Sequence, residues 1–154
     1  MKKELKQVFL LFLAFVLVKG IISYFIPSSK AFSDDYRYLE MAQGFFYNFN
    51  LEVHGLKNIA YQPLYPIVIS ISYLFTDFYL AIKIINSILL SLTIFPVYLL
   101  AKEFLKEKKA LFITIFIALL PSNFTLMSYI MSENLFYPLF LFSIYFIYKS
   151  FKDK

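Results

Sequence analysis

The sequence predicts an all-α membrane protein, a polytopic helix bundle of about four transmembrane helices with an outer loop that carries juxtamembrane helices. Two observations support this class. Hydrophobic residues make up 60% of the 154 residues and charged residues only 16%, which is too apolar for an ordinary soluble domain. Apolar runs long enough to cross a bilayer recur along the chain. We therefore expect residues 1–154 to form a single membrane domain.

The charged residues of the chain indicate membrane topology. Fourteen of the 15 basic residues are lysine, and the formal net charge is +5. Most of these lysines lie in short clusters beside apolar runs, which is typical of topology signals. We expect membrane lipids as partners and no nucleic acid, because the clusters do not form one basic face. The chain has no cysteine, which excludes disulfides, thiolate metal sites and cysteine nucleophiles.

Four apolar runs are candidates for transmembrane helices. At a rise of about 1.5 Å per residue, a helix of about 20 residues covers the hydrocarbon core of a bilayer. The first run contains Lys19, and a secretory signal is its alternative reading. No small-residue cleavage site appears before the apolar run resumes after Lys19, which favours a retained anchor. The predicted spans cover residues 8–26, 78–101, 110–130 and 134–148.

A shorter apolar run, residues 64–75, decides the topology. It is about 12 residues long and opens with Gln62-Pro63-Leu64-Tyr65-Pro66, so it has the length of an interfacial or re-entrant helix. If it does not cross, ten lysines lie inside against three basic residues outside, and if it crosses, the partition inverts. The positive-inside rule favours the first arrangement. We expect a multi-pass protein of the cell membrane with both termini in the cytoplasm and loop 27–77 outside.

The outer loop begins with a helix signal that carries two carboxylates. Ser33 has the character of an N-cap, and Asp34 and Asp35 follow it in the first turn of a helix predicted over residues 34–47. The helix dipole favours aspartate in a first turn whatever the function, and Arg37 is spaced to pair with Asp34 on the surface. A purely structural role for this segment therefore stands beside a functional one.

Several short motifs follow one another in a characteristic order. They are a lysine-rich start and a first span, then Asp34-Asp35-x-x-Tyr38-x-x-x-Ala42, Gln62-Pro63-Leu64-Tyr65-Pro66, Ala81-Ile82-Lys83-Ile84-Ile85-Asn86, Pro121 and Ser132-Glu133-Asn134-Leu135-Phe136. The ordered set resembles the N-terminal part of the GT-C-fold membrane glycosyltransferases, in particular the protein mannosyltransferases, the aminoarabinose transferases and the RgtA/B/C/D-like enzymes. The departures from the family pattern are mild. Asp35 replaces a glutamate, Gln62 a proline and Lys83 a common arginine.

The resemblance implies transfer of a sugar from a polyprenyl-phosphate-linked donor to a lipid, glycan or protein acceptor on the outer face of the membrane. Such a transfer needs a base at the acceptor hydroxyl while the lipid-linked phosphate leaves. Asp34 matches the catalytic base of the family. Asp35 matches the neighbouring acid, which orients the acceptor or, in some members, helps to hold a divalent cation. We expect no other cofactor, and Asp35 and Glu133 would be the ligands in a metal-dependent enzyme.

Further polar residues in or near the spans are candidates for substrate binding. Glu133 lies at the outer end of the third span, on the same side as Asp34, and its alternative role is an N-cap of the last span. Lys83 and Asn86 could present a cation and an amide to the donor phosphate, although snorkelling of Lys83 to the interface is the favoured alternative. The predicted substrate-binding residues are Glu133, Arg37, Lys83, Asn86 and Tyr38.

Two alternatives concern the activity of the chain. The first is a small non-catalytic membrane protein, an accessory or degenerate relative of such a transferase. The second is an N-terminal module, or a truncated or split enzyme, because four spans and one loop supply a base without a full donor site. We then expect an isolated chain to be inactive and to associate with a second membrane subunit or with itself. A transporter is disfavoured, because the spans lack the paired, glycine-interrupted helices of midplane substrate sites.

Overall fold

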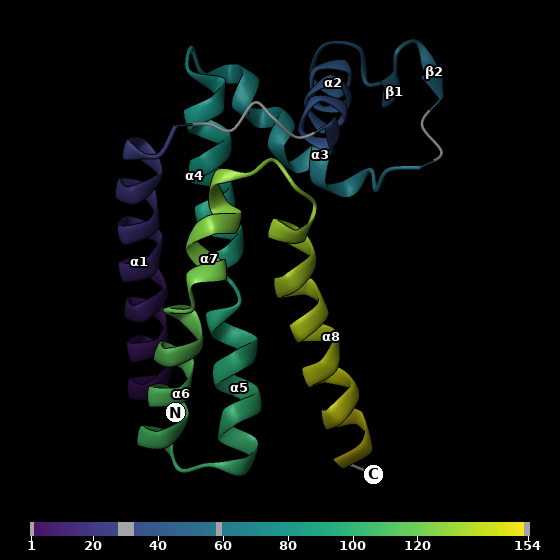
Figure 1. Ribbon diagram of the computed structural model, residues 1–154. Coiled ribbons are helices and arrows are strands. Elements are labelled where there is room, and N and C mark those ends of the chain that lie inside the picture. Colours follow the sequence, from purple (N-terminus) through teal and green to yellow (C-terminus); the bar gives the residue numbers. More distant parts are fainter. Residues whose placement is uncertain (1, 28–32, 58–59, 153–154) are drawn as a thin grey trace.

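The chain folds into long helices that pack side by side, with shorter elements gathered at one end (Figure 1). The computed structural model describes residues 2–27, 33–57 and 60–152. The predicted all-α class is confirmed, with one short antiparallel hairpin added to the helices. The elements in chain order are α1 (Lys2–Phe25), α2 (Ser33–Asn48), β1 (Glu52–Val53), β2 (Leu56–Lys57), α3 (Leu64–Ile69), the 3-10 helix η1 (Ser70–Leu74), α4 (Phe78–Ser91), α5 (Ile94–Phe104), α6 (Glu107–Ala118), α7 (Pro121–Thr125), the 3-10 helix η2 (Leu126–Ser128) and α8 (Glu133–Lys152).

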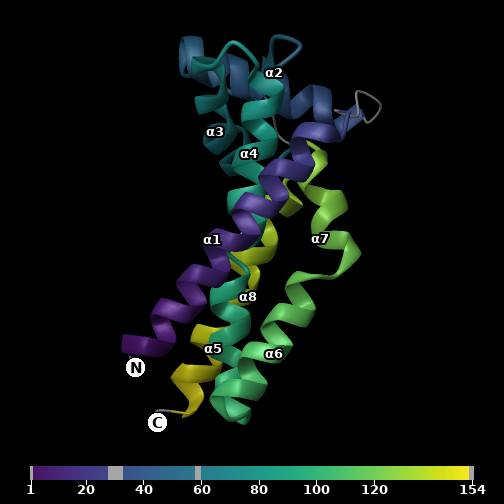
Figure 2. The ribbon, with the colours of Figure 1, turned by 90° about the vertical axis from the view of Figure 1, so that its left-hand side faces the viewer.

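The two ends of the bundle carry charges of opposite sign. The chain termini and the turn between α5 and α6 lie at one end, and α2, α3 and the hairpin lie at the other (Figure 1, Figure 2). We call the first the lysine end, after Lys6, Lys102, Lys106, Lys108, Lys109, Lys149 and Lys152. We call the second the acidic end, after Asp34, Asp35, Glu40, Glu52, Asp77 and Glu133. Lys30 and Lys154, which enter the predicted charge partition, lie outside the described residues.

Two helical stretches in the described part of the chain are long and apolar enough to cross a membrane. They are Glu4–Phe25 and Phe78–Phe104, the second formed by α4 and α5 together. A third results if the bent pair Glu107–Ala118 and Pro121–Ser128 is counted as one span. The predicted fourth span corresponds to α8, which is not among these stretches. The predicted short helix over 64–75 corresponds to the apolar segment Leu64–Leu74.

A proline breaks the third predicted span. The sequence predicts one helix over 110–130, but α6 ends at Ala118 and α7 begins at Pro121, with a bend of 54° between them. Proline has no N–H to donate, and it disfavours the helical conformation in the residue before it. Leu120 is accordingly extended, with φ −57° and ψ 135°. The expectation of an unbroken helix is therefore wrong at this point.

Helix α1 packs along α4, and small polar side chains line part of their contact. The hydroxyl oxygens of Ser23 and Ser87 lie 3.2 Å apart, and both side chains are buried. One turn earlier on α4, the ammonium of Lys83 donates to the backbone carbonyl of Ile26 at 2.8 Å. Small and hydrogen-bonding residues are typical of contacts between apolar helices in membranes, because they allow close approach of the two backbones. These contacts fix the position of α1 along α4.

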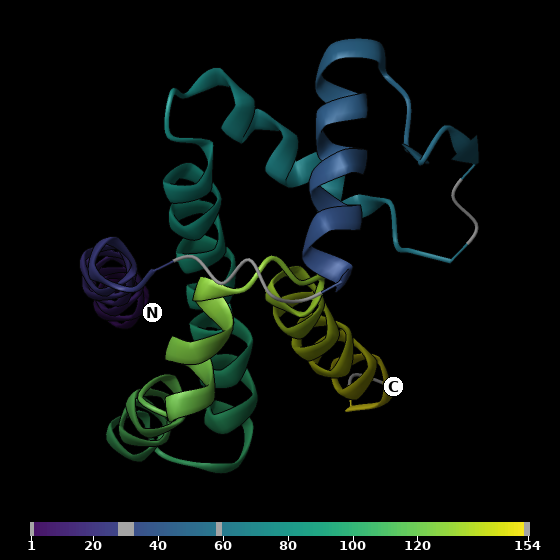
Figure 3. The same ribbon diagram turned by 45° about the horizontal axis from the view of Figure 1, so that its top comes forward.

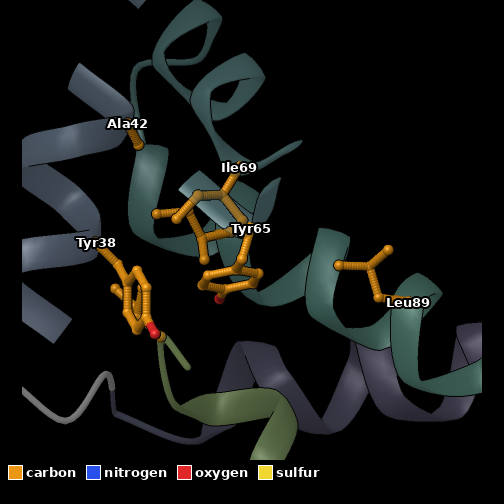
Figure 4. Packing of buried hydrophobic residues seen from close by; sticks show 7 residues of the cluster. Tyr38, Ala42, Tyr65, Ile69 and Leu89 are labelled. Carbon is orange, nitrogen blue, oxygen red and sulfur yellow. The ribbon is translucent and has the colours of Figure 1, made fainter. Parts of the chain in front are cut away.

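A hydrophobic cluster joins α2 and α3 to α4 at the acidic end. The rings of Tyr38 in α2 and Tyr65 in α3 are in contact, with centroids 5.4 Å apart and planes at 87° (Figure 4). This edge-to-face geometry is a favoured one for aromatic pairs. The cluster holds the first turn of α2 close to the start of α8 (Figure 3). Its buried members are Tyr38, Ala42, Tyr65, Ile69, Ile82, Leu89 and Ile130.

Candidate functional site

Asp34 lies in the first turn of α2 and is partly open to solvent. The hydroxyl of Tyr61 donates to Asp34 Oδ1 at 3.3 Å, and Arg37 Nη1 lies 3.7 Å from the same oxygen. The Arg37 guanidinium also lies over the Tyr61 ring, 4.9 Å from its centroid. Tyr61 and Arg37 therefore orient this carboxylate without burying it. The side chain of Ser33, the predicted N-cap, lies outside the described part of the structure.

Asp35 is the buried carboxylate of the site, with 3% of its surface exposed. Burial and, to a lesser extent, the charge of Asp34 together raise the pKa of Asp35 to about 6, and the Ile130 backbone opposes this rise. No described residue forms a hydrogen bond of normal geometry with either carboxylate oxygen. Asp35 therefore exchanges a proton near neutral pH, in contrast to an ordinary surface aspartate.

Tyr38 connects three segments that are far apart in the sequence. Its hydroxyl lies 3.1 Å from Gln62 Oε1 and 3.0 Å from Ser132 Oγ, so it joins α2 to the segments before α3 and α8. The pKa of Tyr38 is raised by burial, and the charges of Glu133 and Asp34 add to this rise, while the Ser132 hydrogen bond opposes it. Both carboxylates therefore act on the same hydroxyl. Tyr38 marks the place where the two acidic segments meet.

A cleft of about 460 Å³ opens beside this hydroxyl, between α3 and the first turns of α8. Its polar wall contains Gln62, Ser132 and Glu133, the residue that begins α8. Its other walls are mostly apolar and follow α8 away from the acidic end. The cleft thus has a polar mouth and an apolar body, which suits a ligand with a polar head and an apolar chain. The lining residues are Gln62, Leu64, Tyr65, Ser132, Glu133, Leu135, Phe136, Tyr137 and Leu139.

A buried network of amides supports the floor of the cleft. The Tyr65 hydroxyl donates to Asn86 Oδ1 at 3.0 Å, and Asn86 Nδ2 donates to the backbone carbonyls of Met127 at 3.3 Å and Tyr129 at 2.9 Å. Asn134 Nδ2 donates to the same Tyr129 carbonyl at 2.9 Å. Asn86 is fully buried, so its amide lies beneath the cleft and joins α4 to the segment before α8.

Lys83 lies away from this cleft, which we call the acidic cleft after Glu133 in its wall. Its ammonium is committed to the carbonyl of Ile26, close to the end of α1, where a lysine can satisfy a terminal carbonyl. Ile26 also lines a separate cavity of about 230 Å³, together with Phe124 and Ser128. The structure thus brings Asp34, Asp35, Arg37, Tyr38 and Glu133 together at one place, and it puts Asn86 below them and Lys83 elsewhere.

Three residues of the site had no role in the sequence-based predictions. Tyr61, Gln62 and Ser132 hold Asp34 and Tyr38 in place, and each lies 24 or more residues from its partner. Gln62 and Ser132 occur in the quoted motifs, but no spacing rule predicts hydrogen bonds over such a separation. For Asn134 and Asn86 the sequence does give a signal, because an amide within an apolar run requires a hydrogen-bond partner.

The carboxylates of the site do not form a metal-binding set. Among the described residues, no group of three or more histidine, aspartate or glutamate side chains is placed to hold a metal ion. Asp35 and Glu133, the predicted ligands in a metal-dependent enzyme, are not part of such a group among these residues. The site is therefore best described as a carboxylate and tyrosine cluster at the mouth of an amphipathic cleft.

Comparisons with known proteins add no relative to this description. No protein family model, curated protein or solved structure matches the chain.

Proposed function

We propose that the chain is a multi-pass protein of the cell membrane that takes part in sugar transfer at the outer face. In this proposal a polyprenyl-phosphate-linked sugar is the donor, and the hydroxyl of a lipid, glycan or protein is the acceptor. The observation that carries the proposal is the amphipathic cleft of about 460 Å³. Glu133 lines this cleft, and the Tyr38 hydroxyl beside it connects the segment of Asp34 and Asp35 to the segment of Glu133.

The separation of charge between the two ends supports the orientation. Long apolar helices lie between the lysine end and the acidic end (Figure 1). The positive-inside rule assigns a lysine-rich end to the cytoplasm. The cleft then opens on the outer side, near the level of the lipid head groups.

The shape of the cleft supports a lipid-linked donor. Leu135, Phe136 and Leu139 extend its apolar wall along α8, where an isoprenoid chain would be shielded from water. Gln62, Ser132 and Glu133 form the polar part, where the sugar and the acceptor hydroxyl would lie. The boundary between the two parts would place the anomeric carbon near the carboxylates.

Asp34 is the proposed base, because it is oriented and open to solvent. The acceptor oxygen forms a bond to the anomeric carbon, the bond from that carbon to the phosphate oxygen breaks, and the proton of the acceptor hydroxyl moves to an Asp34 carboxylate oxygen. The leaving phosphate takes the electron pair of the broken bond. Asp35, which is buried and close to Asp34, is the proposed positioning residue. Tyr38 holds the two sides of the mouth together.

A non-catalytic accessory protein is the second candidate. The observation that favours it is that polar side chains of the site already have partners within the protein. Asp34 contacts Tyr61 and Arg37, and the Asn86 amide makes hydrogen bonds through both its oxygen and its nitrogen. In this case the same contacts only fix the outer loop on the bundle. A partner subunit or a second copy of the chain would then complete an active enzyme.

Photolabelling tests the donor site. A polyprenyl phosphate with a benzophenone in its isoprenoid chain is irradiated with membranes that contain the full chain, and the labelled peptides are identified by mass spectrometry. We expect labelling at Leu135 to Leu139, and loss of most labelling in Leu135→Trp, which fills the cleft. Phe146→Trp, on the same helix but outside the cleft, is the matched control. Absence of labelling, or equal loss in both variants, would contradict the proposal.

A further inference from the structure

A second groove lies at the lysine end, between α1 and α5. It has a volume of about 450 Å³ and is lined by Leu5, Lys6, Phe9 and Phe95. We call it the α1–α5 groove. Lys6 is the one polar residue among the described residues that line it. Three aromatic rings in tilted contact connect the two helices here. The Phe12 centroid lies 5.2 Å from that of Phe95 and 6.0 Å from that of Phe9, with interplanar angles of 43° and 34°.

The groove has the chemistry of a site for a single lipid. Leu5 and Phe9 are 63% and 49% exposed on a helix that is long and apolar enough to cross a membrane, so in a bilayer they contact acyl chains. Lys6 lines the groove together with Phe9, which lies three residues further along α1, or about 5 Å by helical rise. A cation beside an apolar groove matches a phosphate that is joined to an acyl chain.

The charges around the groove favour an anionic lipid. Glu4 is paired with Lys102, and Glu103 is paired with Lys149 and Lys152. Among the described residues, no carboxylate forms an ion pair with Lys6. Exposed Lys106, Lys108 and Lys109 lie at the same end. Within the part of the lysine end that the structure describes, the positive charge is therefore only partly neutralised, and the Lys6 ammonium has no carboxylate partner there.

We propose that the α1–α5 groove binds one acyl chain of an anionic phospholipid and that Lys6 pairs with the phosphate of this lipid. The lipid lies in the leaflet at the lysine end, opposite the acidic cleft. The proposal depends on the membrane placement of α1 and does not depend on sugar transfer. It assigns Lys6 a role that differs from that of the other described lysines, since Lys6 is the one lysine among the described residues that lines the groove.

Native mass spectrometry of the purified full chain tests the proposal. The protein is mixed with equal amounts of phosphatidylglycerol and phosphatidylcholine that have identical acyl chains, and the ratio of the two bound lipids is measured. We expect about a fivefold preference for phosphatidylglycerol, the effect of one lysine at a charged membrane surface. Lys6→Gln should bring the ratio close to one, and Lys6→Arg should keep it.

Lys108→Gln is the matched control, because it removes the same charge at the same end outside the groove. It should keep most of the preference. An equal loss in Lys6→Gln and Lys108→Gln would show a diffuse surface effect and overturn the proposal, as would a wild-type ratio of one. In a separate arm, phosphatidylglycerol with a diazirine in its acyl chain should label Leu5 to Phe9 or Phe95. Even labelling of all helices would also overturn it.

Discussion

The acidic end and the lysine end hold their charges in different ways. At the acidic end, Asp35 is almost fully buried, Asp34 is oriented by a tyrosine hydroxyl, and Glu133 lines a cleft. At the lysine end, Glu4 and Glu103 pair with lysines whose side chains remain partly exposed. Burying a charge costs folding free energy, whereas exposed ion pairs contribute little to stability. The buried carboxylate at the acidic end therefore needs a functional explanation more than the ion pairs at the lysine end do. From this contrast we expect a functional site at the acidic end.

The largest expected effect of a single substitution is that of Asp34→Asn on transfer. Asparagine keeps the size of the side chain and removes the basic carboxylate, so the rate should fall on the order of a hundredfold or more. The measurement is the initial rate of transfer from a radiolabelled polyprenyl-phosphate hexose in membranes in which transfer is established. Asp35→Asn should cost less, because Asp35 is not the proposed base.

Asp77→Asn is the control for Asp34→Asn. Asp77 accepts a hydrogen bond from the Leu80 N–H at 3.0 Å as the N-cap of α4, and asparagine is an equally good cap. This variant should keep the full rate although it removes a carboxylate from the same end. Near-full turnover of Asp34→Asn at unchanged expression would show that the Asp34 carboxylate is structural.

The next effect concerns stability and its dependence on pH. The folded protein binds the Asp35 proton more tightly than the unfolded chain does, because the pKa of Asp35 rises from 3.8 to about 6 on folding. Between these two values stability therefore falls as the pH rises, and the loss is complete above about pH 6. Asp35→Asn, which is always neutral, should stabilise the protein at pH 8 by on the order of 2 kcal/mol.

Thermal melts of wild type and Asp35→Asn in detergent, followed by circular dichroism, measure this difference. The gain in melting temperature should be present at pH 8 and should shrink as the pH falls through 6 towards 4. A variant that is less stable than the wild type at pH 8 would show that the ionised carboxylate is paired in the folded protein.

The smallest effect is expected at the lysine end. Glu103 Oε2 accepts from Lys152 at 2.6 Å and its Oε1 lies 3.2 Å from Lys149, but the pairs are solvent-accessible and screened by salt. Glu103→Gln should therefore leave the melting temperature almost unchanged, and any small shift should vanish at high salt. A salt-independent loss as large as the Asp35 effect would remove the contrast between the two ends.

Local features of this fold were predictable from the sequence. The helix predicted over 34–47 corresponds to α2, and the short run over 64–75 corresponds to the segment Leu64–Leu74. Both predictions depend on neighbouring residues, namely first-turn aspartates and prolines beside a short apolar run. The break at Pro121 was not predicted. The length and apolar composition of residues 110–130 favour one continuous span, although Pro121 lies inside this run.

The candidate site was predictable only in part. The motif around Asp34 and the acid at position 133 were identified, and the structure brings these two segments together. The hydroxyl of Tyr38 that joins them makes contacts over 24 and 94 residues, which depend on the whole fold. The contact of Lys83 could not be predicted from the sequence of its own helix, because its partner is a backbone carbonyl at the end of α1.

The central claim is that the acidic end lies outside the membrane and the lysine end inside. Single cysteines at Leu56→Cys in the hairpin and Ser150→Cys in the last turn of α8 test it directly, because the chain has no cysteine and both positions are exposed. Intact cells are treated with a membrane-impermeant thiol reagent, and permeabilised cells show that both positions are reactive. We expect labelling at position 56 and none at position 150 in intact cells. Labelling at position 150 and not at position 56 would contradict the topology and the outer-face function that depends on it.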